Sequence, residues 1–150
     1  MNLTRRAFLA SLAVCALSAC SSDGGAAPAS DKWHTIVAEG LQVSVPSDAT
    51  LDEDATETLE TIEATTYWIK GNDIVFEVDV LGDGDITGDF EVREVNGMTV
   101  YVQEVEDGLT EAIVPHDGKR YCVIMFFNKN TGSKAAYENA RDHAIESLRF

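Results

Sequence analysis

Apolar and polar residues alternate in short runs along most of the chain after residue 32, and turn-forming dipeptides separate the runs. This period of two is typical of β-strands that bury one side and expose the other. The run at residues 74–80 shows it clearly, because its Ile, Phe and Val residues fall on one side and Glu77 and Asp79 on the other. We therefore expect an antiparallel sheet with one face in contact with solvent.

Three dipeptides predict β-hairpins, because Asn, Asp and Gly accept the positive φ angles of a two-residue turn. The dipeptides with their flanking runs are Gly71-Asn72 between residues 61–70 and 73–81, Asn96-Gly97 between 90–95 and 98–105, and Asp117-Gly118 between 110–115 and 119–127. The run at 119–127 is apolar on both sides, so it predicts a central strand that is covered on both faces. A further run at 41–45 alternates and ends at Pro46.

The last part of the chain changes to helical spacing. Residues 133–148 place a stripe of apolar side chains on one helical face, and Ser133 is suited to cap the first turn. The stripe consists of Tyr137, Ala140, Ala144, Ile145 and Leu148. Since an open sheet needs a layer that buries its apolar face, we expect the stripe to pack on it. The predicted fold is α+β, an antiparallel β-sheet meander with a C-terminal helix packed on one face.

The order of these elements resembles that of PsbP/Mog1-like domains. The resemblance is carried by a strand pair that ends at Pro46, a meander, and a closing helix that ends in Ile-Glu-Ser-Leu-Arg-Phe at residues 145–150. It spans most of residues 40–150 and rests on this layout, with no diagnostic motif. The resemblance implies an accessory or binding domain, since that fold is mostly known for non-catalytic roles, and it transfers no active-site residue.

The start of the chain has a different composition. A basic beginning with Arg5 and Arg6, an apolar run at residues 7–17 and small residues before Cys20 form the three parts of a secretory signal. The apolar run is shorter than the roughly 20 residues that cross a bilayer. The expected division is a signal peptide at residues 1–19, a flexible tether rich in Ser, Gly and Ala at 20–32, and a single α+β domain at 33–150.

Two short motifs in this segment resemble bacterial export signals. Leu17-Ser18-Ala19-Cys20 resembles the lipobox of bacterial lipoproteins, which implies that Cys20 is lipidated and becomes the first residue of the mature chain. Residues 4–9, Thr-Arg-Arg-Ala-Phe-Leu, resemble a twin-arginine signal, although ordinary secretory leaders also carry paired arginines. Two or three acyl chains such as palmitate hold a small domain on a membrane. These resemblances imply an exported cell-envelope protein that is lipid-anchored to the cell membrane, with an extracytoplasmic domain.

The chain carries a formal net charge of −15 at pH 7. A surface this acidic repels phosphates, which excludes nucleic acid as a partner, and it favours cations and basic proteins. Of the three cysteines, Cys15 lies in the leader, Cys20 is the lipidation site and only Cys122 remains in the domain. Cys122 has no second cysteine with which to pair, and its place in an apolar run predicts a buried strand position.

The sequence contains no recognisable catalytic motif. His34, His116 and His143 stand apart from any motif with a nucleophile or a second metal ligand, so we expect surface roles for them. No nucleophile elbow, phosphate-binding loop or zinc spacing occurs. The expected function is a non-catalytic binding or accessory domain, whose partners are the membrane and an envelope protein or small molecule. A calcium-stabilised module and a carboxylate-dependent hydrolase remain as alternatives, and calcium is the one cofactor considered.

One loop matches a known ion-binding pattern. Residues 83–94 satisfy the twelve-residue calcium loop of EF-hands, with Gly88 at the sixth position and Glu94 at the last. The oxygens of acidic and hydroxyl side chains in alternation are the hard ligands that calcium prefers. The expected ligands are Asp83, Asp85, Thr87 and Asp89.

The surroundings of this loop differ from those of an EF-hand, because strand-like runs flank it in place of helices. If residues 90–95 are extended at about 3.3 Å per residue, Asp89 and Glu94 lie about 16 Å apart and cannot share one ion. Glu94 is therefore a doubtful ligand. A reduced calcium site made by the other four residues and an acidic turn that binds nothing both remain open.

Overall fold

The computed structural model describes residues 32–59, 64–71, 73–127, 129–130 and 132–150. The predicted signal peptide, Cys20 and the tether up to residue 31 lie outside the described residues. In the part that is described, no helix is both long enough and apolar enough to cross a membrane.

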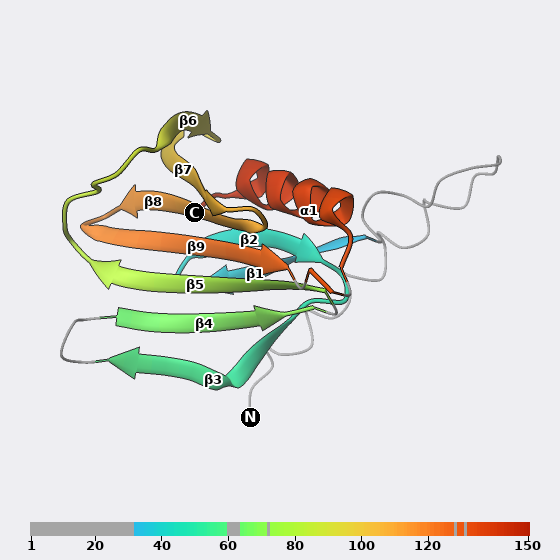
Figure 1. Cartoon of the computed structure of the whole chain (residues 1–150). Helices are drawn as coiled ribbons and strands as arrows, with labels where there is room; N and C mark the ends of the chain where they lie inside the picture. Colours follow the sequence, from blue (N-terminus) through green and yellow to red (C-terminus); the bar gives the residue numbers. More distant parts are fainter. Residues whose placement is uncertain (1–31, 60–63, 72, 128, 131) are drawn as a thin grey trace, which may run out of the picture.

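Seven antiparallel strands form one large sheet, and a two-stranded hairpin packs beside it (Figure 1). The strands of the large sheet, in spatial order, are β3 (Thr50–Leu59), β4 (Ala64–Lys70), β5 (Ile74–Gly82), β9 (Lys119–Phe127), β8 (Leu109–His116), β7 (Met98–Glu106) and β6 (Glu91–Val95). The hairpin pairs β1 (Trp33–Ala38) with β2 (Leu41–Pro46). Two meanders, β3 to β5 and β6 to β9, are thus joined where β5 pairs with β9.

The two hairpin turns that the sequence predicts in the second meander are confirmed. Asn96-Gly97 and Asp117-Gly118 each connect two strands whose pairing continues up to the turn. All four turn residues have positive φ, between 47° and 80°, which is the conformation that these residue types accept. In the first meander β4 and β5 pair as predicted, but Asn72 of their connecting turn lies outside the described residues.

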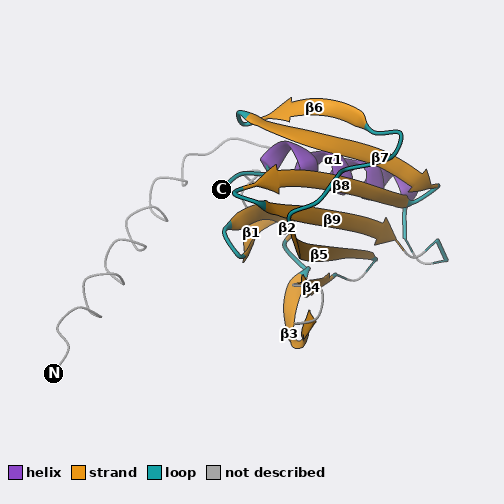
Figure 2. Cartoon of the chain, turned by 90° about the vertical axis from the view of Figure 1, so that its left-hand side faces the viewer, coloured by secondary structure: helices purple, strands orange, loops and turns teal. Residues whose placement is uncertain are grey.

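Helix α1 (Lys134–Ser147) covers one face of the large sheet together with the β1–β2 hairpin (Figures 1 and 2). Ser133 caps the helix as predicted, since its Oγ accepts a hydrogen bond from the backbone N of Ala136 at 3.4 Å. Every residue of the predicted apolar stripe is at most 2% exposed. The α+β fold is therefore confirmed, with an antiparallel sheet and a C-terminal helix on one face.

Tyr137 connects α1 to the sheet at the centre of the core. Its hydroxyl donates a hydrogen bond to the Met125 carbonyl oxygen of β9 at 3.1 Å. It lies 2.8 Å from the Thr110 Oγ1 of β8, and because the tyrosine proton is already used, the threonine is the donor of this second bond. A buried ring whose polar end is satisfied by two strands fixes the register of the helix on the sheet.

One prediction about β9 is wrong. The strand is central, but α1 and the hairpin pack on only one of its faces, and no described helix or strand packs on the other. Val123 and Met125 on the covered side are at most 1% exposed. On the other side Cys122 is 6% exposed, whereas Ile124 and Phe126 are only half-buried. The pattern is apolar on both faces because the second face also carries apolar side chains, and two of them stay partly in contact with water.

Candidate functional site

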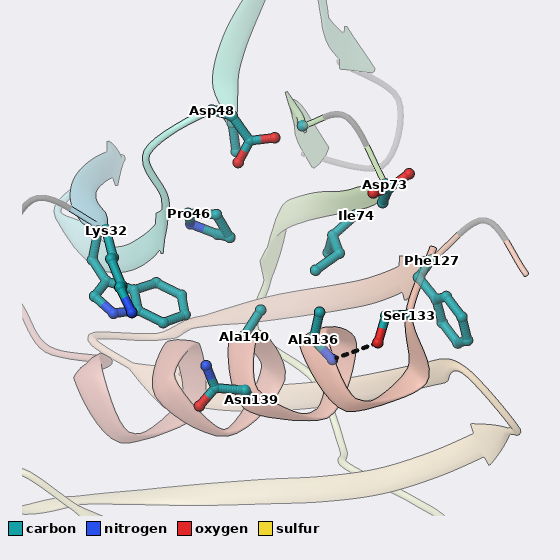
Figure 3. A pocket seen from close by; sticks show the side chains of 13 residues that line it. Lys32, Pro46, Asp48, Asp73, Ile74, Phe127, Ser133, Ala136, Asn139 and Ala140 are labelled. Atoms are coloured by element: carbon teal, nitrogen blue, oxygen red, sulfur yellow. Dashed lines mark hydrogen bonds between the residues drawn. The ribbon is translucent and has the colours of Figure 1, made fainter. Parts of the chain in front are cut away.

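A cavity of about 270 Å³ opens beside the first two turns of α1 (Figure 3). Its other walls are formed by the start of the domain, the end of β2, the β4–β5 turn and the end of β9. The lining residues are Lys32, Trp33, Pro46, Asp48, Ala49, Gly71, Asp73, Ile74, Phe127, Ser133, Ala136, Asn139 and Ala140. This volume suits a small organic molecule or a single side chain, since sites for drug-sized ligands begin near 300 Å³.

Ring stacking holds Trp33 in place at one wall. The indole lies on the His143 imidazole with ring centroids 4.0 Å apart and an angle of 21° between the planes. His143 Nε2 is 3.0 Å from Ser44 Oγ, and the backbone N of Ser44 donates to Ser147 Oγ at 2.9 Å. Because these contacts connect β1, β2 and α1, the tryptophan wall is preorganised before any ligand binds.

Small and apolar residues shape the interior of the cavity. Ala136 and Ala140 present only methyl groups from α1, which leaves space opposite Ile74. The Phe127 ring stacks on the buried Tyr137 ring with centroids 4.8 Å apart, so its position is fixed as well. An apolar ligand body would therefore meet a surface that is already formed.

Charged and amide groups lie at the rim of the cavity. Asp48 and Asp73 approach from the segments after β2 and before β5, Lys32 from the start of the domain, and Asn139 from α1 (Figure 3). Carboxylates accept hydrogen bonds and attract cations, whereas the lysine donates to anionic or carbonyl oxygens. The cavity can thus bind a molecule that combines an apolar body with polar or charged ends.

A second hollow, of about 530 Å³, lies near the β8–β9 turn and borders Asp83. Glu39 and Lys119 at its rim form an ion pair with Oε2 and Nζ 2.8 Å apart. The hydrogen bond from Lys119 lowers the pKa of the Glu39 carboxyl. None of the described residues that line this hollow is aromatic, so we take the cavity beside α1 as the candidate ligand site.

Ser44 and His143 are a nucleophile and a base at hydrogen-bond distance. Sequence reasoning missed this pair because the two residues are far apart in the chain and in no shared motif. A catalytic serine also needs a group that orients its histidine and donors for the oxyanion. The described residues place Trp33 against the imidazole and give it no hydrogen-bonded carboxylate. The established contribution of the pair is to join β2 to α1.

The loop predicted to bind calcium connects β5 to β6 across one end of the large sheet (Figure 2). The four predicted ligands, Asp83, Asp85, Thr87 and Asp89, are all exposed. Asp83 Oδ1 accepts a hydrogen bond from the backbone N of Gly84 at 2.9 Å. Among the described residues, no three His, Cys, Asp or Glu side chains are grouped so that they could hold a metal ion. The calcium site stays a prediction.

Glu94, the doubtful twelfth ligand, lies in β6. It pairs with Thr99 of β7, and its Oε1 accepts a hydrogen bond from the Thr99 Oγ1 at 3.0 Å. This contact gives the Glu94 carboxylate a partner on the neighbouring strand.

The Arg120 side chain binds backbone carbonyl oxygens of the loop that connects β5 to β6, which we call the crossover loop. Its Nε donates to the Gly82 carbonyl oxygen and its Nη1 to the Asp85 carbonyl oxygen, each at 3.2 Å. A Cβ at Gly84 would meet the Arg120 guanidinium at 2.8 Å. Glycine at this position of the loop therefore allows the close approach of the arginine.

Cys122 is buried in the sheet, in surroundings that favour a structural role. Cys122 is 6% exposed, and burial raises the pKa of its thiol to about 12. The low exposure confirms the predicted buried strand position, and a thiol that stays protonated is a poor nucleophile.

His116 stacks on Phe150 with ring centroids 3.7 Å apart, which holds the last residue of the chain against the sheet. His34 is half-buried on β1.

Glu77 is the described carboxyl group whose pKa is raised above its usual value of 4.5. Burial is the main cause, and the charge of Asp79 adds to it. The residue lies on the uncovered face of β5 and does not line the cavity beside α1. Because a general acid requires a raised pKa, Glu77 is the residue on which the carboxylate-hydrolase alternative depends.

Comparison of the chain with protein-family models, with curated proteins and with solved structures gives no match. The resemblance to PsbP/Mog1-like domains and to bacterial lipoproteins stays an expectation from the sequence.

Proposed function

We propose that this protein is a non-catalytic binding domain that a lipid on Cys20 holds at the outer side of a cell membrane. The cavity beside α1 carries the proposal, because it combines an oriented tryptophan, an apolar interior and a polar rim. Sites of this composition bind small molecules and fix their orientation. The lipobox-like residues 17–20 and the tether-like residues 20–32 support the anchored location.

The ligand that fits best has an apolar or aromatic body and a positively charged group. The Trp33 ring and the alanines of α1 suit the body, and Asp73 at the rim suits an ammonium or guanidinium group. The negative charge of the chain raises the local concentration of cations near the rim. Lys32 and Asn139 can bind further polar groups of the same ligand.

A thermal-shift screen of small organic amines tests the cavity. Ala136→Leu fills the cavity with a residue that is also a good helix former. Ala135→Leu is the matched control, because Ala135 is exposed on α1 and does not line the cavity. We expect a hit to raise the melting temperature of the wild-type chain and of Ala135→Leu, and to have no effect on Ala136→Leu. A shift that persists in Ala136→Leu would exclude the cavity as the site.

The anchor has a separate test. Cells that express the full chain are labelled with palmitate, and we expect label in the wild-type protein and none in Cys20→Ala. Label that persists in Cys20→Ala would contradict lipidation at this residue, whatever the result for the cavity.

A further inference from the structure

The face of the large sheet opposite α1 carries a group of apolar and acidic side chains, which we name the open patch. Residues paired across neighbouring strands share one side of a sheet, and the register places the members of the patch together on this face. All of them are half-buried. The open patch consists of Trp68, Glu77, Leu109, Glu111, Ile124 and Phe126.

The apolar part of the patch is unusual for a sheet face in contact with water, where polar residues are expected. Trp68 meets Phe126 edge to face with ring centroids 6.5 Å apart, and Leu109 pairs with Phe126 from β8. Partly exposed aromatic and aliphatic side chains that form one group are typical of surfaces that bind other proteins.

Two carboxylates flank the apolar centre. Glu77 on β5 and Glu111 on β8 both pair with Ile124 on β9. Neighbouring strands are about 4.8 Å apart, so the two glutamates are about 10 Å apart across the isoleucine. Glu111 Oε2 accepts a hydrogen bond from Gln103 Nε2 at 2.6 Å, whereas the described residues give Glu77 no hydrogen-bond or ion-pair partner.

Basic residues on the same face are already engaged. Lys70 Nζ lies 2.7 Å from Asp52 Oδ2, and Arg120 donates to the backbone of the crossover loop. Glu77 is partly desolvated and repelled by Asp79, and its raised pKa reflects this cost. A cation supplied by a partner would offset that cost, so the patch is complementary in charge to a basic surface.

We propose that the open patch docks a protein segment in which lysine or arginine side chains alternate with apolar ones. The apolar side chains pack on Trp68, Ile124 and Phe126, and the basic ones reach Glu77 and Glu111. The net negative charge of the chain steers such a segment toward the patch. The patch lies on the sheet face opposite α1, so this docking does not depend on the ligand proposed for the cavity.

Trp68 is a direct reporter for the test. The chain contains two tryptophans, so in Trp33→Phe the tryptophan emission comes from Trp68 alone. This full-length variant is titrated with a peptide of alternating lysine and leucine. We expect a saturable change in emission whose Kd rises with salt concentration.

Charge variants of this reporter locate the contact. Glu77→Gln and Glu111→Gln should each raise the Kd about tenfold, because each removes one charge-assisted contact. Glu146→Gln is the matched control, since Glu146 is exposed on α1 on the other side of the sheet. It should leave the Kd unchanged.

Three results would overturn the proposal. One is an equal Kd in Glu77→Gln, Glu111→Gln and Glu146→Gln, and another is equal binding of a peptide with glutamate in place of lysine. The third is an emission of Trp68 that changes with protein concentration alone, which would show that a second copy of the chain covers the patch. The variant Trp68→Phe reports on Trp33 at the cavity, so a failure of the patch and a failure of the cavity are distinguishable.

Discussion

His143 Nε2 on α1 lies 3.0 Å from Ser44 Oγ on β2. Neither residue lines the cavity, but the same imidazole stacks on Trp33, which does. The contact therefore sets the position of the cavity wall from behind, and it joins the two elements that together cover the large sheet.

Ser44→Ala should lower the free energy of unfolding by about 1 kcal/mol, the usual contribution of one intramolecular hydrogen bond. It should also weaken binding at the cavity, because the ring behind Trp33 loses its support. Urea unfolding measures the first effect and ligand titration the second. Ser47→Ala removes an exposed hydroxyl nearby and serves as the control. An equal change in both variants would contradict the role assigned to the Ser44–His143 contact.

Glu77→Gln should stabilise the fold at neutral pH. Burial and the charge of Asp79 raise the pKa of this carboxyl above 4.5, so it binds its proton more tightly in the fold than in the unfolded chain. Ionisation of Glu77 therefore destabilises the fold as the pH rises through the raised pKa. Urea unfolding should show a gain in Glu77→Gln at pH 7 that disappears below pH 4.5. An equal gain at both pH values would show that charge burial is not its cause.

Glu77 is expected to lower the stability of the free protein and to strengthen its binding to a basic partner. A carboxylate that lowers stability in the free protein is consistent with selection for binding, because a partner's cation is what offsets its cost. Stability and affinity should then respond to Glu77→Gln in opposite directions.

Gly108 has a φ of +84°, and a Cβ at this position would collide with the Phe127 ring at the edge of the cavity. Gly97 has a φ of +80° with open space around it, so it is the matched control. We expect Gly97→Ala to lower the free energy of unfolding by about 1 kcal/mol through backbone strain alone. Gly108→Ala must in addition displace the Phe127 ring, so we expect it to lower the free energy of unfolding by about 3 kcal/mol in total. Equal losses in the two variants would contradict a close contact between Gly108 and Phe127.

Calcium occupancy of the loop with Asp83, Asp85, Thr87 and Asp89 predicts a calcium-specific rise in melting temperature. At ten times the dissociation constant, binding to the folded state alone stabilises it by about 1.4 kcal/mol. The full chain is melted in chelator, in calcium and in magnesium, and the rise should be lost in the double variant Asp83→Asn/Asp85→Asn. Equal rises in melting temperature with calcium and magnesium would show that the loop is an acidic turn whose charge repulsion any divalent cation screens.

Most of the strands, the predicted turns and the helix could be predicted because their signals are local, whereas β3 (Thr50–Leu59) was not predicted. Alternation along residues 74–80, the positive-φ dipeptides and the stripe on α1 each depend on neighbours within a few positions. The order of the strands depends on the pairing of β5 with β9, which are far apart in the chain. Apolar residues on both sides of β9 predicted two covered faces, since the pattern alone does not distinguish a second packed layer from a surface that binds a partner.

The candidate sites could be predicted less well, because they are formed by residues that are far apart in the chain. Trp33 and His143 stand in unrelated segments, and only the packing of β1 against α1 brings their rings together. The calcium motif was visible because its residues are contiguous, but the backbone between β5 and β6 keeps the side chains exposed. The contact of Arg120 with the Asp85 backbone gives no sequence signal, because any residue type could supply that carbonyl oxygen.

Equilibrium dialysis of a ligand from the amine screen, followed by mass spectrometry of the recovered ligand, tests non-catalytic binding at the cavity most directly. We predict saturable binding of one equivalent per chain, recovery of the ligand chemically intact, and loss of binding in Ala136→Leu with binding kept in Ala135→Leu. Conversion of the ligand to a product, abolished by Ser44→Ala or by Glu77→Gln, would contradict the account and would identify the chain as an enzyme.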